Sequence, residues 1–194
     1  MSNLNAKPAW PLAALLVAAL LATAAPIAAR AQTAGMHMHG AGGMMAHDEV
    51  TMPGLRGFDA TQEESAELMV MFANYETLSR EVTNLSNGIR TVTRSSDETV
   101  MGNLVSHVAG MIARVAEGRD PQIFIQSPTL DIFFMRGEGI TSDIAVTDEG
   151  IVVVQTSEDP ELVAALQTHA AEVSDMAERG MAAVHDMMMK REAN

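Results

Sequence analysis

Residues 88–118 read GIRTVTRSSDETVMGNLVSHVAGMIARVAEG, and residues 150–180 repeat the pattern as GIVVVQTSEDPELVAALQTHAAEVSDMAERG. At this constant offset of 62, nine of the thirty-one positions are identical without a gap, where unrelated sequences would give roughly two. We interpret the match as an internal duplication in which each copy keeps one histidine at the same place. The identical positions are Gly88/Gly150, Ile89/Ile151, Val92/Val154, Ser95/Ser157, Asp97/Asp159, Leu104/Leu166, His107/His169, Ala109/Ala171 and Gly118/Gly180.

The first copy is predicted to begin with a helix followed by a hairpin. Thr61 and Glu64 resemble a capping box, and apolar residues then recur at helical spacing, which indicates a helix over 62–78. An Asn-Gly pair lies between two β-prone runs, 80–85 and 88–94, and such a pair is the strongest short signal for a hairpin.

Each copy is predicted to end with a long helix that buries a matching face. Asp97 can cap the first of these helices and Gly118 can end it, while Asp159 followed by Pro160 is a strong start for the second. Each histidine lies at the third step of its apolar face. The faces are Val100, Leu104, His107, Met111 and Val115 in the first copy, and Leu162, Leu166, His169, Val173 and Met176 in the second.

The second copy repeats the plan with a shorter first helix, which Ser127-Pro128 begins and which runs through Met135. Its hairpin is predicted from strands over 143–147 and 150–155. Two hairpins side by side give a four-stranded antiparallel sheet whose apolar face the helices can cover. We therefore predict an α+β fold with a pseudo-two-fold axis. Its parts are tandem helix-hairpin-helix repeats over 58–118 and 119–180, in a single domain over 58–194 that ends in a methionine-rich helical extension over 181–194.

Residues 1–31 have the features of a secretory signal peptide. Lys7 gives a basic start, an uncharged run rich in Ala and Leu covers 12–25, and Ala29-Arg30-Ala31 fits a signal-peptidase site. The apolar run is shorter than the roughly 20 residues that cross a bilayer. We therefore expect cleavage, no retained membrane span and a periplasmic location.

Charge and cysteine content exclude several classes of function. Without Lys7 and Arg30, ten basic residues remain against twenty-five acidic ones, a formal charge of −15. Nucleic-acid binding is not expected, because it needs basic patches that neutralise phosphates. The chain has no cysteine, which excludes disulfides, thiolate metal sites and covalently attached haem.

Residues 32–57 are expected to form a disordered tail, because they are rich in Gly, Met and His and nearly free of aromatic residues. Thioether sulfur suits Cu(I) or Ag(I), while imidazole also accepts Cu(II), Zn(II) and Ni(II), so copper is the best match. In composition the tail resembles periplasmic copper-handling proteins. The alternative is tolerated low complexity without a ligand. The candidate ligands in the tail are Met36, His37, Met38, His39, Met44, Met45 and His47.

A second candidate site consists of His107 and His169. If the pseudo-axis brings their helices together, the two imidazoles and one or two thioethers, from Met111 and Met176, can converge on one copper ion. Three readings stay open: a copper site, two axial ligands of a non-covalent haem, or core histidines whose ring nitrogens find ordinary partners.

The last helix is rich in methionine. His185 is a further candidate ligand there, while its methionines are explained equally well by packing or by docking to a periplasmic protein partner.

No motif places a nucleophile beside a base or cradles a phosphate, so an enzyme is not expected. The sequence predicts an exported, acidic protein that binds or carries a soft metal, with copper as the expected cofactor. The alternatives are a haem-binding or electron-transfer accessory, and a non-catalytic partner-binding module.

Overall fold

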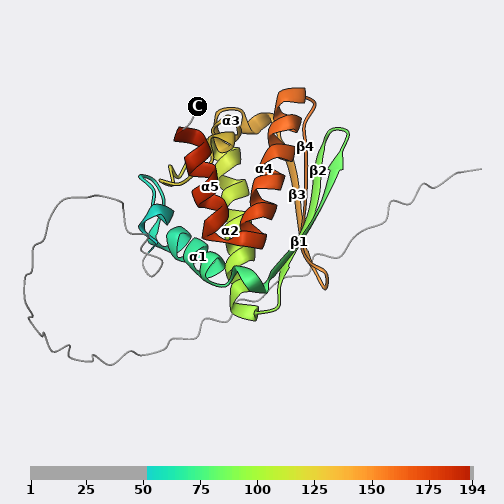
Figure 1. The fold of residues 1–194 in the computed structure, drawn as a ribbon. Coiled ribbons are helices and arrows are strands. Elements are labelled where there is room, and N and C mark those ends of the chain that lie inside the picture. The colour runs from blue at the N-terminus through green and yellow to red at the C-terminus, as the bar shows by residue number, and fades with distance from the viewer. Residues whose placement is uncertain (1–51, 193–194) are drawn as a thin grey trace, which may run out of the picture. The chain divides into compact units, whose positions relative to one another are not determined.

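The computed structural model describes residues 52–192, which form an α+β fold with a four-stranded antiparallel sheet (Figure 1). The predicted class and the predicted sheet are confirmed. The elements are α1 (Gln62–Ala73), β1 (Leu78–Leu85), β2 (Gly88–Ser95), α2 (Glu98–Glu117), α3 (Asp131–Met135), β3 (Thr141–Thr147), β4 (Gly150–Thr156), α4 (Pro160–Arg179) and α5 (Met181–Glu192), with 3-10 turns η1 (Pro53–Leu55), η2 (Tyr75–Thr77), η3 (Pro128–Leu130) and η4 (Gly137–Gly139).

The strand order is β1-β2-β4-β3, so each hairpin contributes one central strand. The central strands β2 and β4 run antiparallel, and their register pairs Thr91 with Val153. These two residues occupy the same position of the two sequence copies. Side chains that alternate along the central strands face the helices, because successive residues of a strand point to opposite faces. The row on this face includes Ile89, Thr91, Thr93, Ile151, Val153 and Gln155.

Local capping explains where the long helices begin and end. The Asp97 carboxylate accepts hydrogen bonds from the backbone N–H groups of Thr99 and Val100, and Asp159 accepts one from that of Glu161. Gly118 and Gly180 end the two helices, each with a positive φ that glycine adopts without strain. The predicted caps at Asp97 and Asp159 and the predicted stop at Gly118 are confirmed.

The core consists of two clusters in which each long helix packs over the central strand of the other hairpin. Residues of α1, α2 and β4 form the first cluster, and residues of α3, α4 and β2 form the second. Their buried members are Met71, Val100, Leu104, Ile151 and Val153 in the first, and Ile89, Phe133, Leu162, Leu166 and Ala170 in the second. α2 and α4 therefore lie together on one side of the sheet, with room between them for a cavity.

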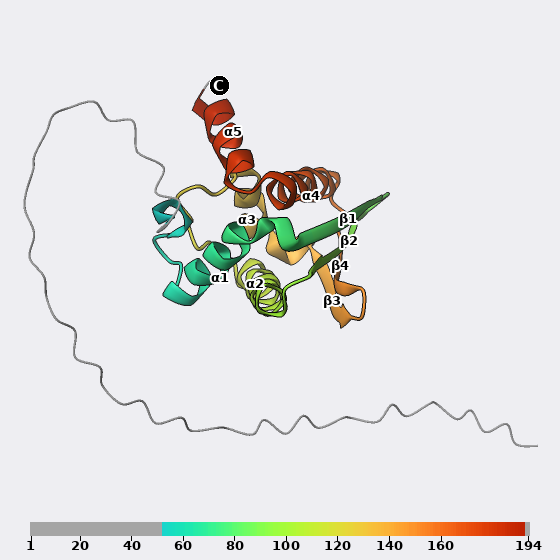
Figure 2. The same cartoon turned by 60° about the horizontal axis from the view of Figure 1, so that its bottom comes forward.

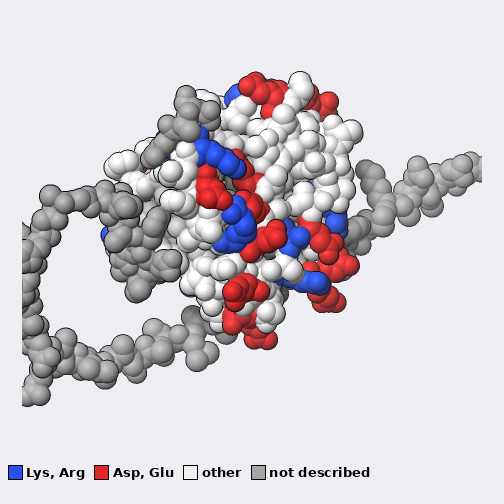
Figure 3. All heavy atoms as spheres, in the orientation of Figure 1, with Lys and Arg blue, Asp and Glu red and all other residues white. Residues whose placement is uncertain are grey.

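α5 continues the chain after Gly180 and leaves α4 at a steep angle, which is clearest in Figure 2. Arg179 of α4 donates hydrogen bonds to Asp175 on its own helix and to Asp186 on α5. In Figure 3, acidic and basic side chains interleave over these two helices. This ion-pair network fixes the start of α5 against α4, although exposed pairs of this kind add little stability.

Several boundaries differ from the sequence prediction. β1 and β3 begin at Leu78 and Thr141, each two residues earlier than predicted, and the helix predicted from Ser127-Pro128 to Met135 is divided into η3 and α3. α1 ends at Ala73 rather than at 78, because Asn74 leaves helical geometry and donates a side-chain hydrogen bond back to the Val70 carbonyl. The folded part also begins before residue 58, since Leu55 is only 2% exposed and Gly57 pairs with Ile123. The predicted signal peptide over 1–31 and most of the predicted tail lie outside the described residues. Within 52–192, no helix combines the length and apolar character that a membrane span requires.

A candidate soft-metal site in the interhelical cavity

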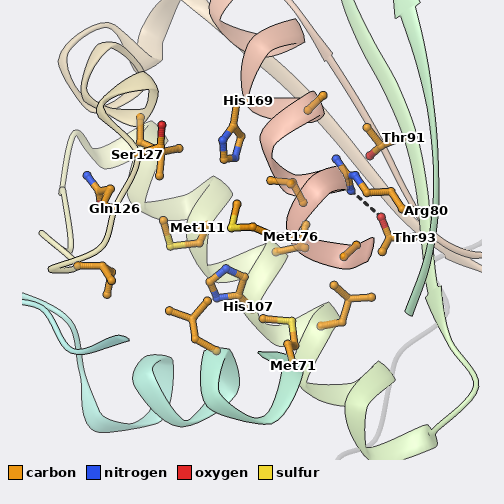
Figure 4. A pocket seen from close by; sticks show the side chains of 18 of the residues that line it. Met71, Arg80, Thr91, Thr93, His107, Met111, Gln126, Ser127, His169 and Met176 are labelled. Atoms are coloured by element: carbon orange, nitrogen blue, oxygen red, sulfur yellow. Dashed lines mark hydrogen bonds between the residues drawn. The ribbon is translucent and has the colours of Figure 1, made fainter. Parts of the chain in front are cut away.

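A cavity of about 300 Å³ lies between α1, α2, α4, the helix-facing side of the sheet and the segment 121–127. Its walls are mostly aliphatic and thioether side chains. His107 of α2 and His169 of α4 both line it (Figure 4). The helix arrangement therefore places both histidines, which match each other in sequence at the offset of 62, in the lining of one cavity.

The predicted methionine partners line the same cavity. Met111 follows His107 by one turn of α2, and Met176 follows His169 by two turns of α4. In Figure 4 the two thioethers lie in the space between the imidazole rings. Two imidazole nitrogens and two thioether sulfurs, each supplied from a helix packed on the sheet, are thus available to one small guest.

His107 is held neutral at physiological pH. Burial lowers the pKa of His107 to about 4, the nearby Glu64 carboxylate raises it only in part, and neighbouring His169 lowers it further. A neutral imidazole keeps a lone pair on one ring nitrogen, which is the form that ligates metals.

A glutamate carboxylate faces the Nδ1 atom of each ring. Nδ1 of His169 lies 3.5 Å from Oε2 of Glu172, and Nδ1 of His107 lies 4.0 Å from Oε2 of Glu67. Both Nδ1 atoms are buried and have no hydrogen-bond partner. Such a carboxylate favours the tautomer with its proton on Nδ1, which leaves Nε2 as the free donor.

Glu172 is itself fixed by neighbouring hydroxyl groups. Its Oε1 accepts hydrogen bonds of 2.9 Å from Ser127 and from Thr129. Burial alone would raise the pKa of Glu172, but contacts with His169, Thr129 and Ser127 lower it overall. The ring of His169 also packs edge-on against Phe133, with centroids 5.8 Å apart. The imidazole is therefore held by a carboxylate and by an aromatic ring.

Arg114 connects α2 to α1 beside the cavity. This guanidinium is only 5% exposed, and it donates hydrogen bonds to the Glu64 carboxylate and to Asp59. The hydrogen bond from Arg114 is the main reason that the pKa of Glu64 falls to about 2. The clamp holds the first turn of α1 near His107.

The remaining candidates lie elsewhere. His185 is exposed on α5 and is not among the residues that line the cavity. Among the described residues, no group of three or more His, Cys, Asp or Glu side chains could hold a metal ion. The tail candidates Met36, His37, Met38, His39, Met44, Met45 and His47 lie outside the described residues.

Glu67 and Glu172 are not among the site residues that the sequence predicted. The spacing of three between His169 and Glu172 was a usable signal, because residues three apart lie on one helix face. Glu67 gave no such signal, since it meets His107 from another helix. Comparisons of the chain with family models, with curated proteins and with solved structures found no match.

Proposed function

We propose that this protein binds a soft metal ion, most suitably copper in its cuprous state, inside the interhelical cavity. Its donors there are Nε2 of His107, Nε2 of His169 and the thioether sulfurs of Met111 and Met176. The observation that carries the proposal is that these four side chains line one cavity although they come from two different helices.

The donor chemistry favours Cu(I) over harder ions. Neutral imidazole and thioether ligands suit a soft monovalent ion, whereas Mg²⁺ and Ca²⁺ need oxygen ligands. The mostly apolar walls offer few oxygen donors that could compete for a cuprous ion. The carboxylates behind His107 and His169 add negative charge one shell away from the ion.

In the wider proposal, the tail captures ions and the cavity holds them more tightly. The tail candidates listed above would supply the first site. With the export features of residues 1–31, this gives a non-enzymatic copper carrier or tolerance protein of the periplasm. A protein partner that receives the ion would dock on the methionine-rich α5, whose Met187 also lines the cavity.

We further infer that the domain arose by duplication and has a pseudo-two-fold axis at the Thr91 and Val153 pair. The sheet supports this. At the offset of 62, Arg80 corresponds to Ser142 and Thr93 corresponds to Gln155. Both pairs form a side-chain hydrogen bond across their hairpin, in which Arg80 donates to Thr93 and Gln155 donates to Ser142. The axis would explain how one histidine per copy produces two donors in one cavity.

The decisive experiment is a Cu(I) titration of the full chain against a competing chelator. We expect tight, stoichiometric Cu(I) binding that is lost in the double variant His107→Leu plus His169→Leu. Binding should be kept in His185→Leu, which changes the same residue type outside the cavity. Deletion of 32–51 should remove only the weaker capacity. Tight binding that survives the double variant would reject the cavity site.

Haem is the second candidate, because two histidines line an apolar cavity. Addition of haem to the purified protein distinguishes it. A Soret shift that depends on both histidines would favour haem over copper. If the double variant is folded and neither ligand binds wild-type protein, both rings are core histidines and docking through α5 becomes the better explanation.

A further inference from the structure

The sheet side of the cavity holds a cation that the copper proposal does not use. Arg80 lies on β1 opposite Thr93 in the register, and it lines the cavity floor with Thr91 and Thr93. Its Nη1 donates a 2.6 Å hydrogen bond to the Thr93 hydroxyl, as the dashed line in Figure 4 marks. The guanidinium thus reaches from the sheet into a largely apolar space.

This cation lacks an anion within the described part of the chain. No carboxylate of residues 52–192 forms an ion pair with Arg80, in contrast to Arg114, Arg136 and Arg179. Its Nε atom is buried and has no hydrogen-bond partner. Burial lowers the pKa of Arg80 to about 10, so the side chain is still charged at neutral pH. The side chain as a whole is half-buried, and a partly buried charge without a counterion carries a desolvation cost that an anionic guest would offset.

We propose that this cavity binds a small amphiphilic carboxylic acid, whose carboxylate sits on the Arg80 guanidinium and the Thr91 hydroxyl and whose apolar body lies among the aliphatic walls. The inference goes beyond metal binding and does not depend on it.

Three features of the cavity select this class of ligand. One guanidinium with a planar pair of donors matches one carboxylate, whereas a doubly charged phosphate would need more cations than the floor provides. The apolar walls need an apolar body, which acetate or inorganic anions lack. The volume of about 300 Å³ is at the lower end of small-molecule sites and suits a short chain or a single ring.

The walls near Arg80 supply suitable apolar contacts. Ile89 and Ile151 flank the row of hydroxyls on the sheet, and Leu104 faces them from α2. Gln155 offers a further polar edge, although its Nε2 already donates to Ser142. Polar groups thus line the sheet side of the cavity and apolar side chains line the rest. This arrangement orients an amphiphile with its polar end toward the sheet.

The test compares octanoate with 1-octanol on metal-free full-length protein by calorimetry. We expect octanoate to bind at least ten times more tightly than the alcohol. Arg80→Met should abolish this preference, whereas Arg90→Met should keep it, because Arg90 is an exposed residue on the opposite face of β2. Copper titration of Arg80→Met should be unchanged, and octanoate binding should survive the double histidine variant.

Several results would overturn the proposal. Equal affinities for octanoate and 1-octanol would mean that Arg80 recognises no anion, and acetate as effective as octanoate would mean that the apolar walls recognise nothing. A preference that persists in folded Arg80→Met would place the anion elsewhere. The comparison of acid with alcohol needs only wild-type protein, so it decides the question even if Arg80→Met fails to fold.

Discussion

Nδ1 of His169 lies 3.5 Å from Oε2 of Glu172, one turn further along α4, while the other oxygen of the same carboxylate is held by Ser127 and Thr129. The carboxylate is therefore anchored before it meets the ring. The anchored carboxylate favours the tautomer with its proton on Nδ1, which leaves Nε2 as the donor toward the cavity. The i,i+3 pair of His169 and Glu172 therefore orients the imidazole.

The first prediction concerns this carboxylate. Glu172→Gln removes the negative charge behind the imidazole, and we expect Cu(I) affinity to fall about 10-fold to 100-fold, as for other groups that contact a metal-binding histidine. The matched control is Glu178→Gln on the exposed side of α4, which should leave the affinity within about 2-fold. Chelator competition measures both. Equal affinities in the two variants would mean that Glu172 does not support the ligand.

The second prediction concerns the clamp between α1 and α2. Arg114→Met leaves the Glu64 carboxylate without its main partner, so we expect the free energy of unfolding to fall by about 2 kcal/mol. The loss should be below that of a fully enclosed pair because water reaches Glu64. Arg119→Met removes a half-exposed arginine with surface partners and should cost less than about 1 kcal/mol. Urea unfolding of both variants checks the difference.

The local parts of the fold were predictable because their signals are local. The cap at Asp97, the stop at Gly118 and the Asn-Gly turn each act within a few residues, and the structure places them as expected. The end of α1 was misplaced because its apolar spacing continues through Tyr75 and Leu78. Those side chains remain at the cavity while the backbone leaves the helix at Asn74.

The candidate site was predictable only in part. Helical spacing placed Met111 near His107, but their approach to His169 depends on how α2 and α4 cross the sheet, which the sequence does not encode locally. Arg80 was overlooked for a similar reason. From its place in a strand, Arg80 would be expected to be an ordinary solvent-facing cation, and only the cavity above β1 buries its Nε atom.

The third prediction tests the close approach of the two hairpins. A Cβ atom at Gly88 would lie 1.9 Å from the carbonyl oxygen of Gln155, and one at Gly150 would lie 2.4 Å from that of Thr93. Gly88→Ala and Gly150→Ala should each destabilise the fold by about 2 kcal/mol or more, since backbone must move. Because Gly88 and Gly150 are equivalent positions in the proposed duplication, the two variants should lose similar amounts of stability. Gly110→Ala, which meets nothing within 4 Å, should instead gain up to about 1 kcal/mol.

The last prediction follows from the lowered pKa of His107, which is about 4 in the folded chain and 6.5 as the ordinary value. Between these values the unfolded chain binds a proton that the folded chain does not, so stability must fall as the pH drops from about 6.5 to about 4. The groups that face the ring are Glu64, Glu67 and His169. Glu64 contributes in a different window, because its pKa of about 2 means that its stabilisation is lost only as the pH falls below about 4.5.

This window can be measured by urea unfolding of metal-free protein between pH 7 and pH 4.5. Wild-type protein should lose up to about 3 kcal/mol through this one group over the full window, and His107→Leu should remove that part of the slope. His185→Leu changes an exposed histidine and should keep the slope. A slope that is the same in wild type and His107→Leu would mean that the ring takes up its proton in the folded state as readily as in the unfolded chain. Such a ring would be hydrated, and the neutral imidazole on which the proposed donor site depends would lose its basis.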